Sequence, residues 1–170
     1  MTRPRDPLLT ATKWLLRIGI AGLTLALAAA AIAVGALMLY PGKVVPRLAA
    51  APPGTIWWVI AAVIVVIAIL ALSIRFAVDL SRIVATVGHD DPFQPENADR
   101  LDRMAWMSLG VQLLGFVLAP LVGMIATHAG EARNDYSVSF SGFLLALVLF
   151  VLARVFRHGT EMRDDLEGTV

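Results

Sequence analysis

Residues 48–74 read LAAAPPGTIWWVIAAVIVVIAILALSI and contain no Asp, Glu, Lys or Arg. Three further stretches are also without these charged residues: 18–42, 104–130 and 136–153. Because a helix rises about 1.5 Å per residue, about 20 apolar residues cross the roughly 30 Å of membrane hydrocarbon. The four stretches therefore predict an all-α, polytopic integral membrane protein with four transmembrane helices.

The composition of the whole chain leads to the same class. Of its 170 residues, 58% are hydrophobic, and the mean hydropathy is +0.77. Soluble domains hold roughly 45–50% apolar residues. A net charge of only +1 argues against direct nucleic-acid binding, and the absence of cysteine excludes disulfides and thiolate metal sites. We expect a single four-helix transmembrane domain over residues 1–170 and no cofactor.

Positive charges are distributed unequally between the two sides of the predicted spans, which favours one orientation. One side holds eleven Lys or Arg residues and the other three, Lys43, Arg47 and Arg133. Both termini and the central loop are therefore predicted to face the cytoplasm, in a bacterial cytoplasmic membrane. One alternative stays open for the first span: its basic start and run of alanines also resemble a secretory signal, although 25 uncharged residues exceed the usual apolar core of 7–15. The eleven are Arg3, Arg5, Lys13, Arg17, Arg75, Arg82, Arg100, Arg103, Arg154, Arg157 and Arg163.

The predicted spans cover about 17–40, 56–75, 104–127 and 138–156, with a cytoplasmic loop at 76–103 and a tail at 157–170. The second and third helices are expected to extend into the cytoplasm, over 56–87 and 95–127, because no Gly or Pro interrupts 56–87 and Pro95 suits a first helical position. Gly159 is expected to allow a break in the last helix. Pro120 favours a kink, either static or a gating hinge.

The foot of the second helix carries two kinds of side chain. An apolar stripe needs a partner, either lipid headgroups or another cytoplasmic segment, while Arg75, Asp79 and Arg82 are expected to point to water. The stripe consists of Phe76, Leu80, Ile83, Val84 and Val87.

The first span is rich in small residues. Gly22, Ala26 and Ala30 recur at every fourth position, on one helix face. This pattern permits a packing seam or dimer face, but it also occurs in ordinary alanine-rich spans.

The central loop and the end of the chain hold a recognisable set of residues. The loop reads GHDDPFQPENADRL over 88–101, and the chain ends VFRHGTEMRDDLEGTV over 155–170. These segments resemble a family of small bacterial four-span membrane proteins known as domain of unknown function 2975. The matching positions are Gly88, Pro92, Phe93, Glu96, Asn97, Arg100, Leu101, Phe156, Gly159, Thr169 and Val170.

The resemblance departs from the family pattern at Gln94, where a Ser or Thr would cap the third helix, and at Gly168, which replaces an apolar residue. It implies no established reaction. Some family members are similar to products encoded beside small helix-turn-helix regulators, so the resemblance implies a regulatory setting and names the matching positions as candidate interaction residues.

We interpret the loop and tail as one assembled cytoplasmic face. The acidic residues of the tail are expected to pair with Arg100 and Arg103, while Phe93 and Leu166 pack on the stripe of the second helix. Exposed ion pairs contribute only about 0–1 kcal/mol each, so apolar docking would supply most of the stability. The acidic residues are Asp164, Asp165 and Glu167.

Catalytic and metal sites are weakly indicated. His89 with Asp90 and Asp91, and His128 with Glu131 and Asp135, hold metal-ligand types, but a solvated loop explains both groups more simply. Gln112 is best explained as an interhelical hydrogen bond.

Because the four uncharged stretches hold no Asp, Glu, Lys or Arg for catalysis or ion relay, we expect a non-enzymatic regulatory or interaction protein that acts through its loop and tail. The expected partners are a helix-turn-helix regulator or another cytoplasmic protein. The alternative is a small transporter or channel subunit that acts as a homo-oligomer.

Overall fold

The computed structural model describes residues 7–40, 52, 54–87, 94–128 and 139–167. Four helices account for nearly all of them: α1 (Pro7–Leu39), α4 (Thr55–Val87), α5 (Pro95–His128) and α6 (Ser141–Glu167). Each helix is long and apolar enough to cross a membrane. The prediction of an all-α chain with four such helices is confirmed.

The helix boundaries agree closely with the sequence signals at α4 and α5. The predicted helices 56–87 and 95–127 appear as Thr55–Val87 and Pro95–His128. Pro95 occupies the first helical position, where its missing N–H costs no hydrogen bond. The predicted break at Gly159 is wrong, because α6 continues through this residue to Glu167. One glycine costs a helix only about 1 kcal/mol relative to alanine, which is too little to end it by itself.

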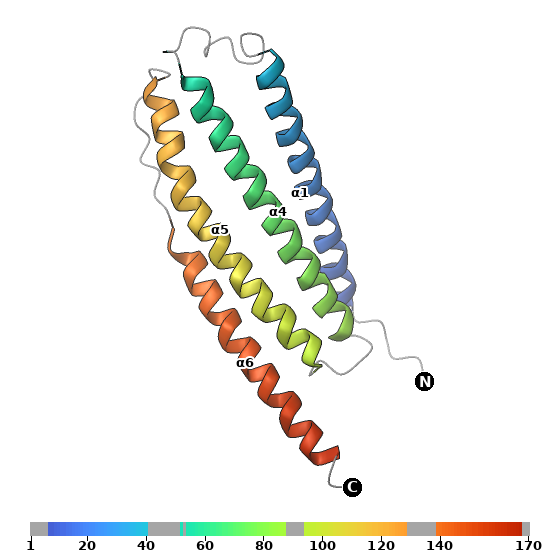
Figure 1. The fold of residues 1–170 in the computed structure, drawn as a ribbon. Coiled ribbons are helices and arrows are strands. Elements are labelled where there is room, and N and C mark those ends of the chain that lie inside the picture. Colours follow the sequence, from blue (N-terminus) through green and yellow to red (C-terminus); the bar gives the residue numbers. More distant parts are fainter. Residues whose placement is uncertain (1–6, 41–51, 53, 88–93, 129–138, 168–170) are drawn as a thin grey trace.

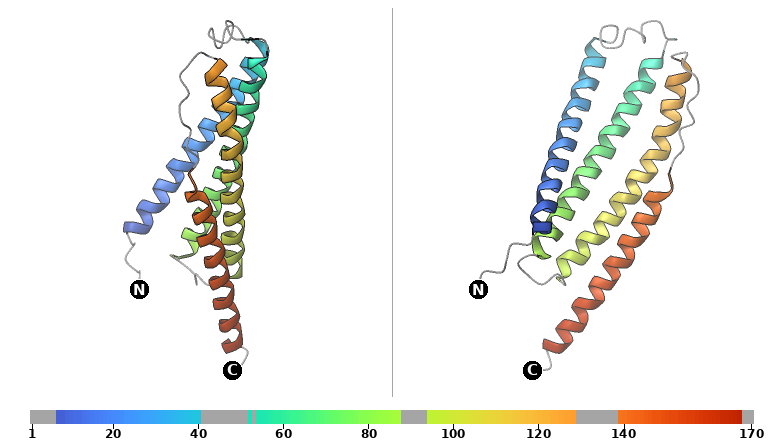
Figure 2. Two further views of the ribbon diagram at one scale, coloured as in Figure 1. Left: turned by 90° about the vertical axis from the view of Figure 1, so that its left-hand side faces the viewer. Right: turned by 180° about the vertical axis from the view of Figure 1, so that it is seen from behind.

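The helices lie side by side in chain order, and each packs extensively on the next (Figure 1). Among the described helices, α1 and α6 form the two edges of this row and do not pack extensively on each other. Figure 2 shows from the side that α4, α5 and α6 share one layer, whereas α1 crosses it at an angle. The arrangement is therefore an open row of four helices.

The buried core lies where α4, α5 and α6 meet. Leu101, Met104 and Ala105 of α5 pack against Leu149 and Ala153 of α6. Three residues of the predicted stripe of α4 cover this cluster, together with two aromatic residues of α6. The stripe therefore has a protein partner, the first turns of α5 and the second half of α6. The covering residues are Phe76, Leu80, Ile83, Phe150 and Phe156.

We call the end of the row that contains this core the basal end. There α1 begins, α4 ends and α5 begins, and α6 passes beyond the others (Figures 1 and 2). Away from the basal end, many large apolar side chains are exposed, such as Leu25, Ile64 and Leu147. A surface of this kind is stable in hydrocarbon and unstable in water.

The small-residue face of α1 points away from its neighbour. A Cβ atom added at Gly22 would meet no atom within 4 Å, and Ala26 is exposed. The inner side of α1 instead carries Leu37, which is 5% exposed. The predicted seam is therefore not used between the helices of one described chain.

Candidate functional site

A carboxylate surrounded by arginines lies at the basal end, between α4 and α5. Asp79 of α4 has an exposed fraction of 0%. Arg75 and Arg82 approach it from the adjacent turns of the same helix, with nitrogen–oxygen distances of 4.0 Å and 3.7 Å. Arg103 reaches it from α5, and its Nε lies 3.5 Å from Oδ2 of Asp79. We call these four residues the Asp79 cluster.

The charges of the Asp79 cluster do not balance. Three guanidinium groups surround one carboxylate, which leaves a surplus of two positive charges. The arginine side chains are 57%, 52% and 46% exposed for Arg75, Arg82 and Arg103, so each touches Asp79 while part of it reaches the surface. Within the described residues neither oxygen of Asp79 accepts a hydrogen bond, so the cluster is held by charge and burial.

The expectation that Asp79 points to water is wrong, although the two arginines of α4 are indeed exposed. Asp79 lies on the side of α4 that faces α5, one residue before the core residue Leu80. Its charge is tolerated there because cations surround it, whereas an isolated buried carboxylate would be costly. The sequence held a signal for this arrangement: arginines at i−4 and i+3 share a helix face with the aspartate.

A second polar contact joins the same two helices. Asn97 of α5 is fully buried, and its Nδ2 donates a hydrogen bond of 2.9 Å to Oγ1 of Thr86 on α4. Arg100 donates a hydrogen bond of 2.7 Å from Nη1 to Oδ1 of Asn97. Asn97 therefore connects the end of α4 to the start of α5, close in sequence to the Asp79 cluster.

The contact between α5 and α6 at the basal end is more exposed. Nη2 of Arg157 lies 3.4 Å from Oδ1 of Asp99, and both side chains are largely accessible to solvent. Within the described residues, Arg100 contacts Asn97 and Arg103 contacts Asp79, and the pairing of these arginines with the acidic tail stays a prediction. The side chains of 164–167 lie outside the described part.

Further along the row, α5 and α6 are joined by uncharged groups. Oγ of Ser108 donates to the carbonyl oxygen of Gly142 at 3.2 Å, and Nε2 of Gln112 donates to that of Ser139 at 2.6 Å. The hydrogen bond predicted for Gln112 is present, but its acceptor, Ser139, lies two residues before α6 begins, so it joins α5 to the segment that leads into α6. Gly142 lies so close to Gln112 that a Cβ atom at this position would overlap Oε1 of that side chain. We call this contact the neutral joint.

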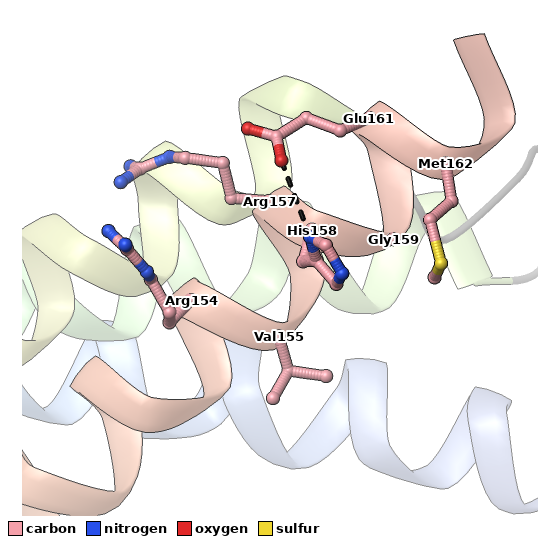
Figure 3. Close-up of a pocket in the computed structure, with 7 residues that line it drawn as sticks. All are labelled: Arg154, Val155, Arg157, His158, Gly159, Glu161 and Met162. Atoms are coloured by element: carbon pink, nitrogen blue, oxygen red, sulfur yellow. Dashed lines mark hydrogen bonds and ion pairs between the residues drawn. The ribbon is translucent and has the colours of Figure 1, made fainter. Parts of the chain in front are cut away.

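The C-terminal half of α6 presents a charged surface. It lines a shallow hollow in which Nδ1 of His158 lies 3.4 Å from Oε2 of Glu161 (Figure 3). Both side chains are about two-thirds exposed or more, and Met162 beside them is 54% exposed. Thr160 is buried, and its hydroxyl donates to the carbonyl oxygen of Arg157 at 2.6 Å. This helical segment therefore offers both charged and apolar contacts.

The structure brings several of the candidate interaction residues together. Asn97 and Leu101 are buried and contribute to helix packing, and Phe156 packs on the same core. Glu96 is exposed in the first turn of α5, and Gly159 lies within α6. The candidates that are buried in helix packing are therefore not available for contact with another molecule. The remaining candidates lie outside the described residues: Gly88, Pro92, Phe93, Thr169 and Val170.

The two possible metal groups cannot be placed, because His89, Asp90, Asp91, Glu131 and Asp135 lie outside the described residues. Within the described ranges, no three His, Asp or Glu side chains are arranged to hold a metal ion. His128, the last residue of α5, contacts the carbonyl oxygen of Met124 through Nδ1 at 2.7 Å.

The fold and composition together define a multi-pass membrane protein with four candidate spanning helices. The chain belongs to the family described as protein of unknown function DUF2975, whose model matches residues 63–170. That match covers most of α4 and all of α5 and α6, and so contains the Asp79 cluster and the neutral joint. No curated protein and no solved structure matches the chain.

Proposed function

We propose that this protein is a non-enzymatic protein of the bacterial cytoplasmic membrane that presents the second half of α6, with the adjoining central connection, to a cytoplasmic protein. The observation that carries the proposal is the continuation of α6 to Glu167, beyond the basal end of α4 and α5 (Figures 1 and 2). A helix that projects with exposed charged and apolar side chains is suited to docking against another protein.

The orientation is part of the proposal. The basal end of the row carries most of the arginines of the described residues, and positively charged ends of spans remain on the cytoplasmic side. The start of α1 and the end of α6 lie at this same end (Figure 1). The segments of α4 and α5 that carry the Asp79 cluster would then stand at the inner headgroups. A reporter fused after Val170 should be active only in the cytoplasm.

The nature of the partner follows from the exposed groups. The second half of α6 offers the exposed residues Arg154, His158 and Glu161 beside Met162, which favours a protein surface of mixed charge. A helix-turn-helix regulator, as the family resemblance implies, is one such partner, and another membrane subunit with a cytoplasmic domain is a second.

Site-specific crosslinking tests this proposal. A photo-crosslinking amino acid at Met162, in the full chain in native membranes, should give one discrete adduct with another protein. The matched control places the same amino acid at Val148, which is 53% exposed on the same helix but within the uncharged stretch. Lack of a protein adduct at Met162, or the same adduct at both positions, would contradict the proposal.

The open row favours a second candidate, a small transporter or channel subunit that acts as a homo-oligomer. One copy encloses no bundle interior, so a pathway would require several copies. The described part of the uncharged stretches offers Ser108 and Gln112 as polar groups to line it, with His128 at the end of α5. Solute flux through liposomes that contain the purified chain would favour this candidate.

A further inference from the structure

The arginines of the Asp79 cluster have donor capacity that the described residues do not use. Arg75 and Arg103 approach Asp79 through Nε, so their terminal nitrogens are not the atoms of the described ion pairs. Among the described residues, none of the three arginines donates a hydrogen bond that meets ordinary geometry, and each side chain is about half exposed. Guanidinium groups in this state bind oxyanions well, because each offers several N–H donors in a fixed plane.

The position of the cluster identifies the kind of oxyanion. Asp79 lies five residues beyond Ile74, the end of the uncharged stretch, which corresponds to about 7.5 Å along the helix. That distance places the arginines at the level of the lipid headgroups. The exposed Trp106, one turn after Arg103 on α5, is a residue type that favours the same interfacial level.

The carboxylates near the cluster leave its surplus charge in place. Asp79 neutralises one of the three arginines, and Asp99 is engaged by Arg157 of α6. Asp102 is half-buried on α5, next to Arg103 in sequence. When the negative charge of Asp102 is added to the charges of the cluster, the sum is still one positive charge.

We propose that Arg75, Arg82 and Arg103, which lie around the buried carboxylate of Asp79, form a binding site for the phosphate of an anionic phospholipid headgroup. Two helices contribute to the site, so a bound headgroup would also hold α4 against α5. The ligand chemistry is that of a phosphodiester, and the membrane is its source. This proposal does not depend on the orientation of the chain or on the partner of α6.

A variant series in the purified full chain separates lipid binding from folding. Asp79→Asn removes the buried carboxylate, so that arginines can then be replaced without leaving an unpaired buried charge. The test variant is Asp79→Asn with R82Q and R103Q. The control is Asp79→Asn with K13Q and R17Q, which removes two positive charges from α1 at the same end of the row. Circular dichroism and gel filtration verify that all variants are folded.

Dioleoylphosphatidylglycerol is the probe, titrated into the detergent-solubilised protein and counted by native mass spectrometry. The wild type and Asp79→Asn should both bind it in preference to dioleoylphosphatidylcholine. The test variant should bind this lipid at least about tenfold more weakly than Asp79→Asn does. Each arginine near an anionic lipid contributes roughly a fivefold gain in affinity, and the test variant lacks two of them. The affinity of the control should differ from that of Asp79→Asn by less than about twofold, because its charges belong to α1, which contributes no residue to the cluster and crosses the layer of α4, α5 and α6 at an angle (Figure 2).

Three results would overturn the proposal. The first is equal affinity of the wild type for the two lipids, and the second is equal loss of affinity in the test and control variants. The third is displacement of the bound lipid by millimolar inorganic phosphate, which would make free phosphate the ligand.

Discussion

The basal end and the neutral joint hold neighbouring helices together by different means. At the basal end, a buried carboxylate among three arginines connects α4 to α5, and an exposed ion pair connects α5 to α6. Deeper in the row, the contact between α5 and α6 uses only a hydroxyl, an amide and a glycine. The difference follows the surroundings: charge can be stabilised where water and headgroups reach, whereas hydrocarbon favours neutral hydrogen bonds and close backbone approach.

The largest expected effect tests the charged contact. Replacing all three arginines of the Asp79 cluster by glutamine leaves the carboxylate buried without a cation. Because removing the partners of a buried charge is strongly destabilising, the free energy of unfolding should fall by about 3–5 kcal/mol. Denaturation in mixed micelles of increasing dodecyl sulfate content measures it. A loss below about 1 kcal/mol would be typical of surface pairs and would contradict the burial of Asp79.

The next effect tests the close approach at the neutral joint. Gly142→Ala would place a methyl group against Gln112, which must move and give up its bond to Ser139. Because the displaced atom is the end of a flexible side chain, the cost should lie near the lower end of the roughly 1–3 kcal/mol that is typical of overpacking. Gly123→Ala on α5 is the matched control, since its Cβ atom would meet nothing within 4 Å. Equal effects in the two variants, measured in the same denaturation assay, would refute the close packing at Gly142.

A smaller effect isolates the hydrogen bond itself. Gln112→Leu keeps the side chain large but removes the donor to the carbonyl oxygen of Ser139. Interhelical hydrogen bonds in membranes contribute on average about 0.6 kcal/mol, with a maximum near 1.7 kcal/mol. The free energy of unfolding should therefore decrease by about 0.6 kcal/mol, and by no more than about 1.7 kcal/mol. An increase in stability would show that the amide contributes nothing to the joint.

The smallest effect concerns the exposed pair of Arg157 and Asp99. Arg157→Gln should change the unfolding free energy by about 0–1 kcal/mol, because both side chains are accessible to water. Salt should reduce the difference between wild type and variant, because it screens exposed charges. Unfolding at low and high sodium chloride checks this, and a salt-independent loss would contradict an exposed ion pair.

Much of the architecture follows from the pattern of charge along the chain. Uncharged stretches locate the helices, and Pro95 together with the absence of Gly and Pro from 56–87 gives the extent of α4 and α5. A hydrogen bond from Gln112 could be predicted because an amide in hydrocarbon needs a partner, although the acceptor, Ser139, lies just before α6. These predictions succeed because each depends on local composition and on the general cost of burying polar groups.

The rest depended on how the helices pack. The burial of Asp79 could not be decided from its own helix, because it requires Arg103 from α5 and the covering core. The open row could not be predicted either. An apolar span has no amphipathic pattern that shows which of its faces contacts lipid and which contacts another helix. The break predicted at Gly159 was wrong because the residues on both sides of it form a helix that one glycine does not interrupt.

The most direct test of the central claim compares four proteins: wild type, Asp79→Asn, the triple glutamine variant, and that variant combined with Asp79→Asn. If the arginines stabilise the fold by compensating the buried carboxylate, adding Asp79→Asn should restore most of the 3–5 kcal/mol expected to be lost, to within about 1 kcal/mol of Asp79→Asn alone. If the two sets of changes are additive instead, the carboxylate and the arginines do not act as one unit, and the account of the basal end is wrong.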